Sequence, residues 1–178
     1  MVAEAELVST ENGLVPEGEG WFVVNTREAR WFENDVFGRY CAFEGDVRFP
    51  EVGANIGVLE PGQSGCMYHG ESNQEDFLVL SGECLLLVEG EERRLRAWDF
   101  FHSPAWTDHV LVGAGDGPCV ILAVGARKPG SKVRYPTAEI ADAHDAGVLE
   151  TTESPQEAYA RFPENVERPY RDGDLPQW

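Results

Sequence analysis

The side chains best suited to chemistry lie near the middle of the chain. Three of the four histidines fall between positions 69 and 109. His69 is followed by Glu75 in a polar stretch, and His109 comes directly after the segment 104–108. Imidazole nitrogens and carboxylate oxygens are the ligands that borderline divalent metals prefer. Neighbouring strands that point such groups into a barrel would enclose a metal ion with open coordination positions.

Other polar side chains near these residues are candidates for supporting roles. His102 stands between Phe101 and Ser103 in an apolar stretch, which favours a hydrogen-bonded core or wall residue. Alternatively, His102 acts as a general base beside the metal, because the pKa of histidine suits proton transfer near neutrality. Tyr68 and Gln74 are candidates for contact with a substrate or bound water.

The elements that must position these side chains are short strands. Strand-like segments recur roughly every 8–12 residues, separated by turn signals such as Glu60-Pro61-Gly62 and Gly113–Pro118. This spacing is typical of an all-β barrel or sandwich. We expect strands at residues 21–24, 37–43, 55–59, 77–80, 84–88, 93–95, 100–103, 109–112 and 119–124.

The composition shifts on both sides of this strand-rich region. Residues 1–19 are polar and predict a loose N-terminal arm, whereas residues 20–126 predict the barrel. Residues 127–178 predict short helices, near 138–148 and 155–162, followed by an extended tail over the barrel or a neighbouring subunit. The whole unit is not repeated, so we expect one barrel.

The charge of the chain excludes several classes of partner. Its 32 acidic and 14 basic residues give a formal net charge of -18. Such a surface repels nucleic acid phosphates and anionic lipids. No apolar run approaches the roughly 18 residues of a membrane span, and the first residues lack the basic start of a signal peptide. The four cysteines show no CxxC pairing, which indicates free thiols in a reduced, cytoplasmic protein.

Two segments resemble the conserved motifs of the cupin superfamily. In the first, Glu75 is followed by the six residues DFLVLS and then by Gly82. In the second, WDFFHSPAWTDH, Pro104 precedes His109 by five residues. The resemblance covers about residues 55–126. It implies an all-β fold, a double-stranded β-helix of the cupin or jelly-roll type, which holds one divalent transition metal such as zinc, manganese, iron or nickel.

The chain departs from the cupin motifs at two positions. The first motif has two histidines separated by one residue, but only His69 is present, and Glu71 stands at the second position. The resemblance then implies His69, Glu71, Glu75 and His109 as ligands; alternatively, Glu71 points outward and leaves three. The second motif lacks its usual glycine at Trp106. Because tryptophan tolerates positive φ poorly, we expect a locally different loop whose Trp106 lines the barrel mouth.

These features leave three functions open, because a fold alone does not determine a reaction. The first is an enzyme, such as an isomerase, lyase or dioxygenase, that acts on a small polar molecule through the metal, with His102 or Glu71 moving protons. The second is a non-catalytic module that binds or senses a small ligand. The third is a metal-free sugar epimerase or isomerase, which would need arginines in its pocket. The resemblance also implies a homodimer in which N-terminal strands join the partner's sheet.

Overall fold

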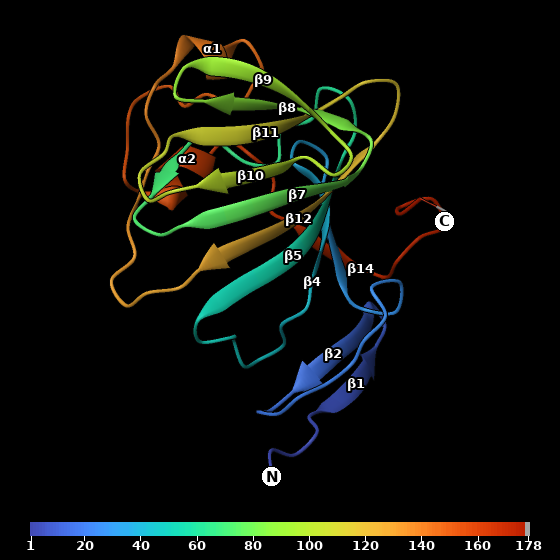
Figure 1. The fold of residues 1–178 in the computed structure, drawn as a ribbon. Coiled ribbons are helices and arrows are strands. Elements are labelled where there is room, and N and C mark those ends of the chain that lie inside the picture. The colour runs from blue at the N-terminus through green and yellow to red at the C-terminus, as the bar shows by residue number, and fades with distance from the viewer. Residues whose placement is uncertain (177–178) are drawn as a thin grey trace.

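The structure is a computed structural model that describes residues 1–176, and its named strands all pair in antiparallel fashion. The larger sheet has the order β10 (Phe100–Ser103), β7 (Glu75–Ser81), β12 (Cys119–Ala126), β5 (Val52–Leu59), β4 (Gly38–Ala42), β3 (Trp31–Asn34) and β14 (Val166–Arg168). The smaller sheet has the order β11 (His109–Ala114), β8 (Glu83–Val88) and β9 (Glu91–Arg96). The predicted all-β barrel is therefore confirmed (Figure 1).

Side chains from the two sheets meet in the barrel core. Leu59 and Val79 of the larger sheet pack in one cluster with Leu86 and Leu111 of the smaller sheet. Along β8 the side chains alternate, as a strand requires: Leu86 faces this core, whereas Leu87 packs in a second cluster on the other face. Side chains on both faces of β8 and β11 are therefore packed in apolar clusters.

The C-terminal region supplies the cover for that second face. The short helices α1 (Glu139–Asp142) and α2 (Pro155–Tyr159) confirm the expected C-terminal helices. Ser154 caps α2, because its hydroxyl accepts a hydrogen bond from the Glu157 amide (3.3 Å), and Pro155 favours the first helical turn. Ala141 of α1 packs against Leu87 and its neighbours. The short pair β6 (Gly70–Glu71) and β13 (Val133–Arg134) joins this region to the barrel rim.

The N-terminal segment is paired rather than loose. Residues 6–17 form a hairpin of β1 (Glu6–Thr10) and β2 (Gly13–Glu17), which stands away from the barrel in Figure 1. Its turn is stabilised by Thr10, whose hydroxyl donates to the Gly13 carbonyl oxygen (2.8 Å). Apolar pairs such as Val8 with Val15 flank the two-residue turn Glu11-Asn12, and this local pattern favours the pairing. The division into residues 1–19, 20–126 and 127–178 stays a prediction.

Two other local expectations are wrong. Residues 21–24 form no strand and make a single bridge from Trp21 to Glu4. Trp106 does not force a different loop: it adopts φ 68°, the left-handed conformation that a glycine would take. None of the helices within residues 1–176 is long and apolar enough to cross a membrane.

Candidate metal centre

Three strands bring His69, Glu75 and His109 together at the rim of the barrel. His69 directly precedes β6, Glu75 is the first residue of β7, and His109 is the first residue of β11. The two histidines form an isolated bridge, in which the His109 amide donates to the His69 carbonyl oxygen (2.8 Å) and the His69 amide to the His109 carbonyl oxygen (3.1 Å). This backbone pairing places the imidazole ring centroids 5.1 Å apart.

The three side chains point ligand atoms at one spot. Oε2 of Glu75 lies 3.6 Å from Nε2 of His69 and 3.4 Å from Nε2 of His109. All three ligand atoms lie within 4.8 Å of one another. Both histidines are buried, so water screens the cluster little. Two nitrogens and one oxygen gathered in this way match the donor set of a divalent transition metal site.

Backbone carbonyls orient both imidazole rings. Nδ1 of His69 donates to the Met67 carbonyl oxygen (2.9 Å), and Nδ1 of His109 donates to the Thr107 carbonyl oxygen (3.0 Å). Such bonds fix the tautomer, which leaves the lone pair of each Nε2 directed at Glu75. This is the arrangement that metal-binding histidines require, because the second ring nitrogen must hold the proton.

Two buried atoms of the cluster have no hydrogen-bond partner. Oε2 of Glu75 and Nε2 of His109 are both inaccessible to solvent and unpaired. Buried polar atoms almost always have partners, and an unpaired one costs free energy. Because both orphaned atoms face the same point, a cation coordinated there would satisfy them together. The residues present therefore fit a divalent metal ion.

The charges of Glu75 and His109 agree with that fit. Burial alone would raise the pKa of Glu75, but the neighbouring His69 and the charge of His109 outweigh burial and lower it. Burial and the neighbouring His69 lower the pKa of His109. An ionised carboxylate and a neutral imidazole are the forms that bind metal. Burial would lower the pKa of His69, but Cys66 and Glu75 outweigh burial and raise it, so a metal that binds there must displace a proton from this imidazole.

Glu71 lies beside this cluster without joining it. Its Oε1 is 3.8 Å from Nε2 of His69, and the three converging ligands do not include it. Burial and the charge of Glu75 raise the pKa of Glu71. Glu71 does not point outward but lines the cavity next to the three converging side chains.

The cluster opens into a cavity of about 370 Å³ inside the barrel. Strand residues such as Asn55, Phe77 and Ile121 form part of its wall. Tyr135 and Tyr159 come from the C-terminal region, and the sequence did not indicate them. Burial raises the pKa of Tyr135 to about 12, so its hydroxyl stays protonated at neutral pH. No local motif marks these tyrosines, because they reach the cavity only through the packing of the tail onto the barrel.

His102 does not reach the cavity, so the structure gives it no role as a base beside the metal. It faces the outer side of β10, half exposed, and its Nδ1 pairs with Oδ1 of Asp76 (2.6 Å), its partner across the strands. Its neighbours explain this orientation: Phe101 packs on the core and Ser103 contacts Nδ1 of His109 (3.3 Å). Because strand side chains alternate, the residue between them must point outward.

The three predicted pocket residues also lie outside the cavity. Tyr68 packs in the cluster on the outer face of the smaller sheet, where its hydroxyl accepts a hydrogen bond from the Gly90 amide (3.3 Å). Gln74 is exposed and donates to Oδ2 of Asp76 (2.7 Å). The Trp106 backbone lies near the rim, where its amide donates to the Glu71 carbonyl oxygen (2.6 Å). Its ring packs on Arg134 and is partly exposed to solvent.

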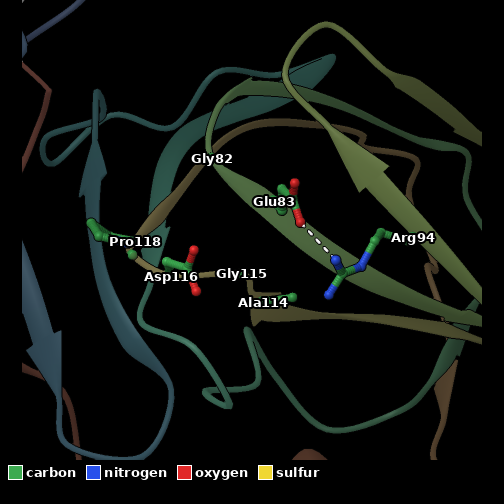
Figure 2. A pocket seen from close by; sticks show the side chains of 8 residues that line it. Gly82, Glu83, Arg94, Ala114, Gly115, Asp116 and Pro118 are labelled. Carbon is green, nitrogen blue, oxygen red and sulfur yellow. Dashed lines mark ion pairs between the residues drawn. The ribbon is translucent and has the colours of Figure 1, made fainter.

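Two further cavities lie on the surface. One of about 580 Å³ shares Phe37, Tyr40 and Tyr159 with the barrel cavity and lies under residues 156–165. The other, of about 450 Å³, is separate and is shown in Figure 2. It is framed by the ion pair of Arg94 and Glu83 (3.0 Å), both partly exposed. In residues 1–176, the one converging group of metal-ligating side chains is therefore in the barrel cavity.

Comparison with known proteins gives one family match. Residues 55–125 match the family model described as Cupin domain, and a search of curated proteins found no match. This match includes Glu75 and both histidines of the cluster. It agrees with the resemblance seen in the two sequence motifs.

Several solved structures are similar to part of the chain. A candidate sugar phosphate isomerase from Acidithiobacillus ferrooxidans is 28% identical over 48% of this chain and 56% of its own, with a TM-score of 0.46. A cupin-superfamily sugar phosphate isomerase from Silicibacter pomeroyi is 24% identical over 62% of this chain and 66% of its own, with a TM-score of 0.48. A Cupin 2 conserved barrel domain protein from Salinispora arenicola is 25% identical over 49% of this chain and 73% of its own, with a TM-score of 0.44. This chain thus spans less than two thirds of the first two.

Proposed function

We propose that this chain, whose residues 55–125 form a cupin domain, binds one divalent transition metal through His69, Glu75 and His109 and acts as an enzyme on a small molecule. The observation that carries the proposal is the pair of orphaned atoms, Oε2 of Glu75 and Nε2 of His109, buried 3.4 Å apart. Zinc, manganese, iron and nickel all suit a donor set of two imidazoles and one carboxylate.

The number of ligands favours catalysis over a purely structural metal. Structural sites are closed by four protein ligands, whereas catalytic sites keep an open position. A bound divalent metal would supply Lewis-acid chemistry at that position. Glu71 lies 3.8 Å from Nε2 of His69 and lines the cavity. A carboxylate in this place can accept a proton from a bound hydroxyl group and return it.

The alternative functions have less support. A binding or sensing module would favour a saturated site, but three side chains converge here in residues 1–176. A metal-free sugar epimerase that acts on a phosphate would need arginines in the pocket. Arg93, Arg94 and Arg96 lie on β9, are exposed, and do not line the barrel cavity.

Metal content tests the proposal. The native chain, purified without a histidine tag, is expected to carry close to one transition metal per chain by mass spectrometry. The His69→Ala and His109→Ala variants are expected to lose that metal. His144→Ala is the matched control, because His144 pairs with Glu92 at the surface (2.9 Å) and should leave metal content unchanged. A native protein that is metal-free and takes up no added zinc, manganese, nickel or iron contradicts the proposal.

We also propose that the chain forms a homodimer through its N-terminal region. The β1–β2 hairpin stands away from the barrel, and Trp21 and Val23 beside it are largely exposed. Exposed apolar residues of this kind often mark protein interfaces. Light scattering should give the mass of two chains, and the mass of one chain would contradict the dimer.

A further inference from the structure

The charge of the barrel cavity restricts the molecules that it can hold. Within residues 1–176, Arg39 is the one lysine or arginine that lines the cavity. Its Nη1 lies 2.8 Å from Oε1 of Glu60, and its Nε lies 2.8 Å from Oδ1 of Asp174. The side chain is 13% exposed. Two carboxylates therefore already neutralise this guanidinium.

The other charged side chains in the cavity are acidic. Glu71 and Glu75 both line it, with Oε2 of Glu75 at the centre of the histidine cluster. A phosphate group placed in the cavity would meet no free cation apart from the metal and would approach these carboxylates. A charge buried without a partner is strongly unfavourable. The cavity is thus poorly suited to a phosphorylated substrate.

Beside the cluster, much of the cavity wall is apolar and rich in aromatic rings, although Arg39 and Asn55 also line it. Phe77 lies edge-on to the ring of His109, with centroids 5.3 Å apart. Tyr135 faces the ring of His69 at 5.8 Å, and Tyr159 lies edge-on to Tyr135, also at 5.8 Å. Aromatic rings in such a wall prefer offset-stacked or edge-to-face contact with another ring. This wall therefore matches a flat, apolar body.

We propose that the substrate is a phosphate-free molecule with a ring-containing apolar body and one or two hydroxyl or carbonyl oxygens at the end that meets His69, Glu75 and His109. This inference rests on the proposed metal site, because the oxygens are expected to occupy its open positions. The ring lies between Phe77 and the two tyrosines, and the substrate hydroxyl lies within reach of Glu71.

Three hydroxamates test this class of substrate, because they share one metal-binding group and differ in the rest. They are acetohydroxamate, benzohydroxamate and phosphoglycolohydroxamate, titrated by calorimetry into the zinc-loaded full chain. Burial of a phenyl ring should make benzohydroxamate bind about tenfold tighter than acetohydroxamate or more. The phosphorylated compound should bind no tighter than acetohydroxamate.

A matched pair of variants tests the aromatic wall. Tyr159→Ala removes a ring from α2 and should reduce the preference for benzohydroxamate over acetohydroxamate, with zinc content unchanged. Tyr159→Phe keeps the ring and should retain the preference.

The possible failures are distinguishable. If the chain holds zinc but the phosphorylated compound binds tightest, or the phenyl ring gains nothing, the substrate class is wrong and the metal site stands. If the chain holds no zinc and binds none of the three compounds, the proposed function itself is wrong.

Discussion

At the scale of single residues, the site depends on which carboxylate meets the histidines. Glu75 and Glu71 are four positions apart, and both line the cavity. Only Oε2 of Glu75 is buried, unpaired and within 3.6 Å of both Nε2 atoms. Glu71 approaches one of them, at 3.8 Å. The two side chains thus have different roles despite their similar chemistry.

This difference predicts unequal effects of two matched substitutions. Glu75→Gln removes the charged ligand and should weaken zinc affinity about 100-fold or more, because supporting groups alone change affinity about 10- to 100-fold. Glu71→Gln should weaken zinc affinity less than about tenfold, below the range of a supporting group, because Glu71 is not among the three converging ligands. Competition against a fluorescent chelator measures both affinities. Equal losses in the two variants would contradict a three-ligand site.

Trp98 illustrates a backbone effect away from the cavity. It adopts φ 76°, although its side chain is 70% exposed and has little packing to lose. A left-handed backbone is strained in residues that have a Cβ, and glycine relieves this strain. Glycine also raises the conformational entropy of the unfolded chain, which offsets part of the gain. Trp98→Gly should therefore be more stable than Trp98→Ala by about 0.5–1 kcal/mol. Urea unfolding of both variants measures this, and an alanine variant of equal stability would count against strain at Trp98.

At the scale of elements, the strands were more predictable than the segments that cover them. The histidine cluster was found because β7 and β11 carry compact local motifs, Glu75 with Gly82 and Pro104 with His109. His102 was misjudged because its place in a strand, between two inward side chains, was not used. Tyr135 and Tyr159 could not be predicted, because they approach the cavity through contacts with residues distant in sequence.

The tail is a further element that the sequence did not resolve. Arg168 at the end of β14 forms two hydrogen bonds to the Asp174 carboxylate (2.7 and 2.9 Å), and Arg39 of β4 pairs with the same carboxylate. Both Arg168 and Asp174 are buried. The tail is therefore joined to the barrel by a buried ion pair next to Arg39, which also lines the cavity.

Removing Asp174 should therefore destabilise the protein in a pH-dependent way. Asp174→Asn leaves buried guanidinium groups without their partner, which should cost about 3 kcal/mol at neutral pH. Burial alone would raise the pKa of Asp174, but Arg168, the Arg171 amide and Arg39 outweigh it and lower the pKa. The stabilisation is complete above the unfolded pKa of about 3.9 and is lost as pH falls through the lower folded pKa.

Chemical unfolding at pH 7 and below pH 4 measures this dependence. The gap between the native chain and Asp174→Asn should shrink at the lower pH. Glu91→Gln is the control, because Glu91 pairs with Arg93 on the exposed surface and such pairs contribute little. A gap that is independent of pH would exclude the ionised pair as its source.

At the scale of the whole molecule, the cluster ties together parts of the chain that are far apart in sequence. His69 precedes β6, Glu75 begins β7 of the larger sheet, and His109 begins β11 of the smaller sheet. An ion bound by all three would link the two sheets across the barrel rim. Unfolding separates these ligands, so metal binding must add to the stability of the folded chain.

Metal removal should therefore lower the thermal midpoint of unfolding. A free metal concentration of about 100 times Kd stabilises the folded state by about 2.7 kcal/mol, so treatment with EDTA and dialysis should lower Tm by several degrees. Added zinc should restore it. The His109→Ala variant can differ from the native chain in Tm, so each protein is compared with and without the treatment. The Tm of His109→Ala should respond to neither EDTA nor added zinc. If neither EDTA nor added zinc changes the Tm of the native chain, the cluster does not bind zinc in the folded state. The unpaired atoms of Glu75 and His109 would then need another partner.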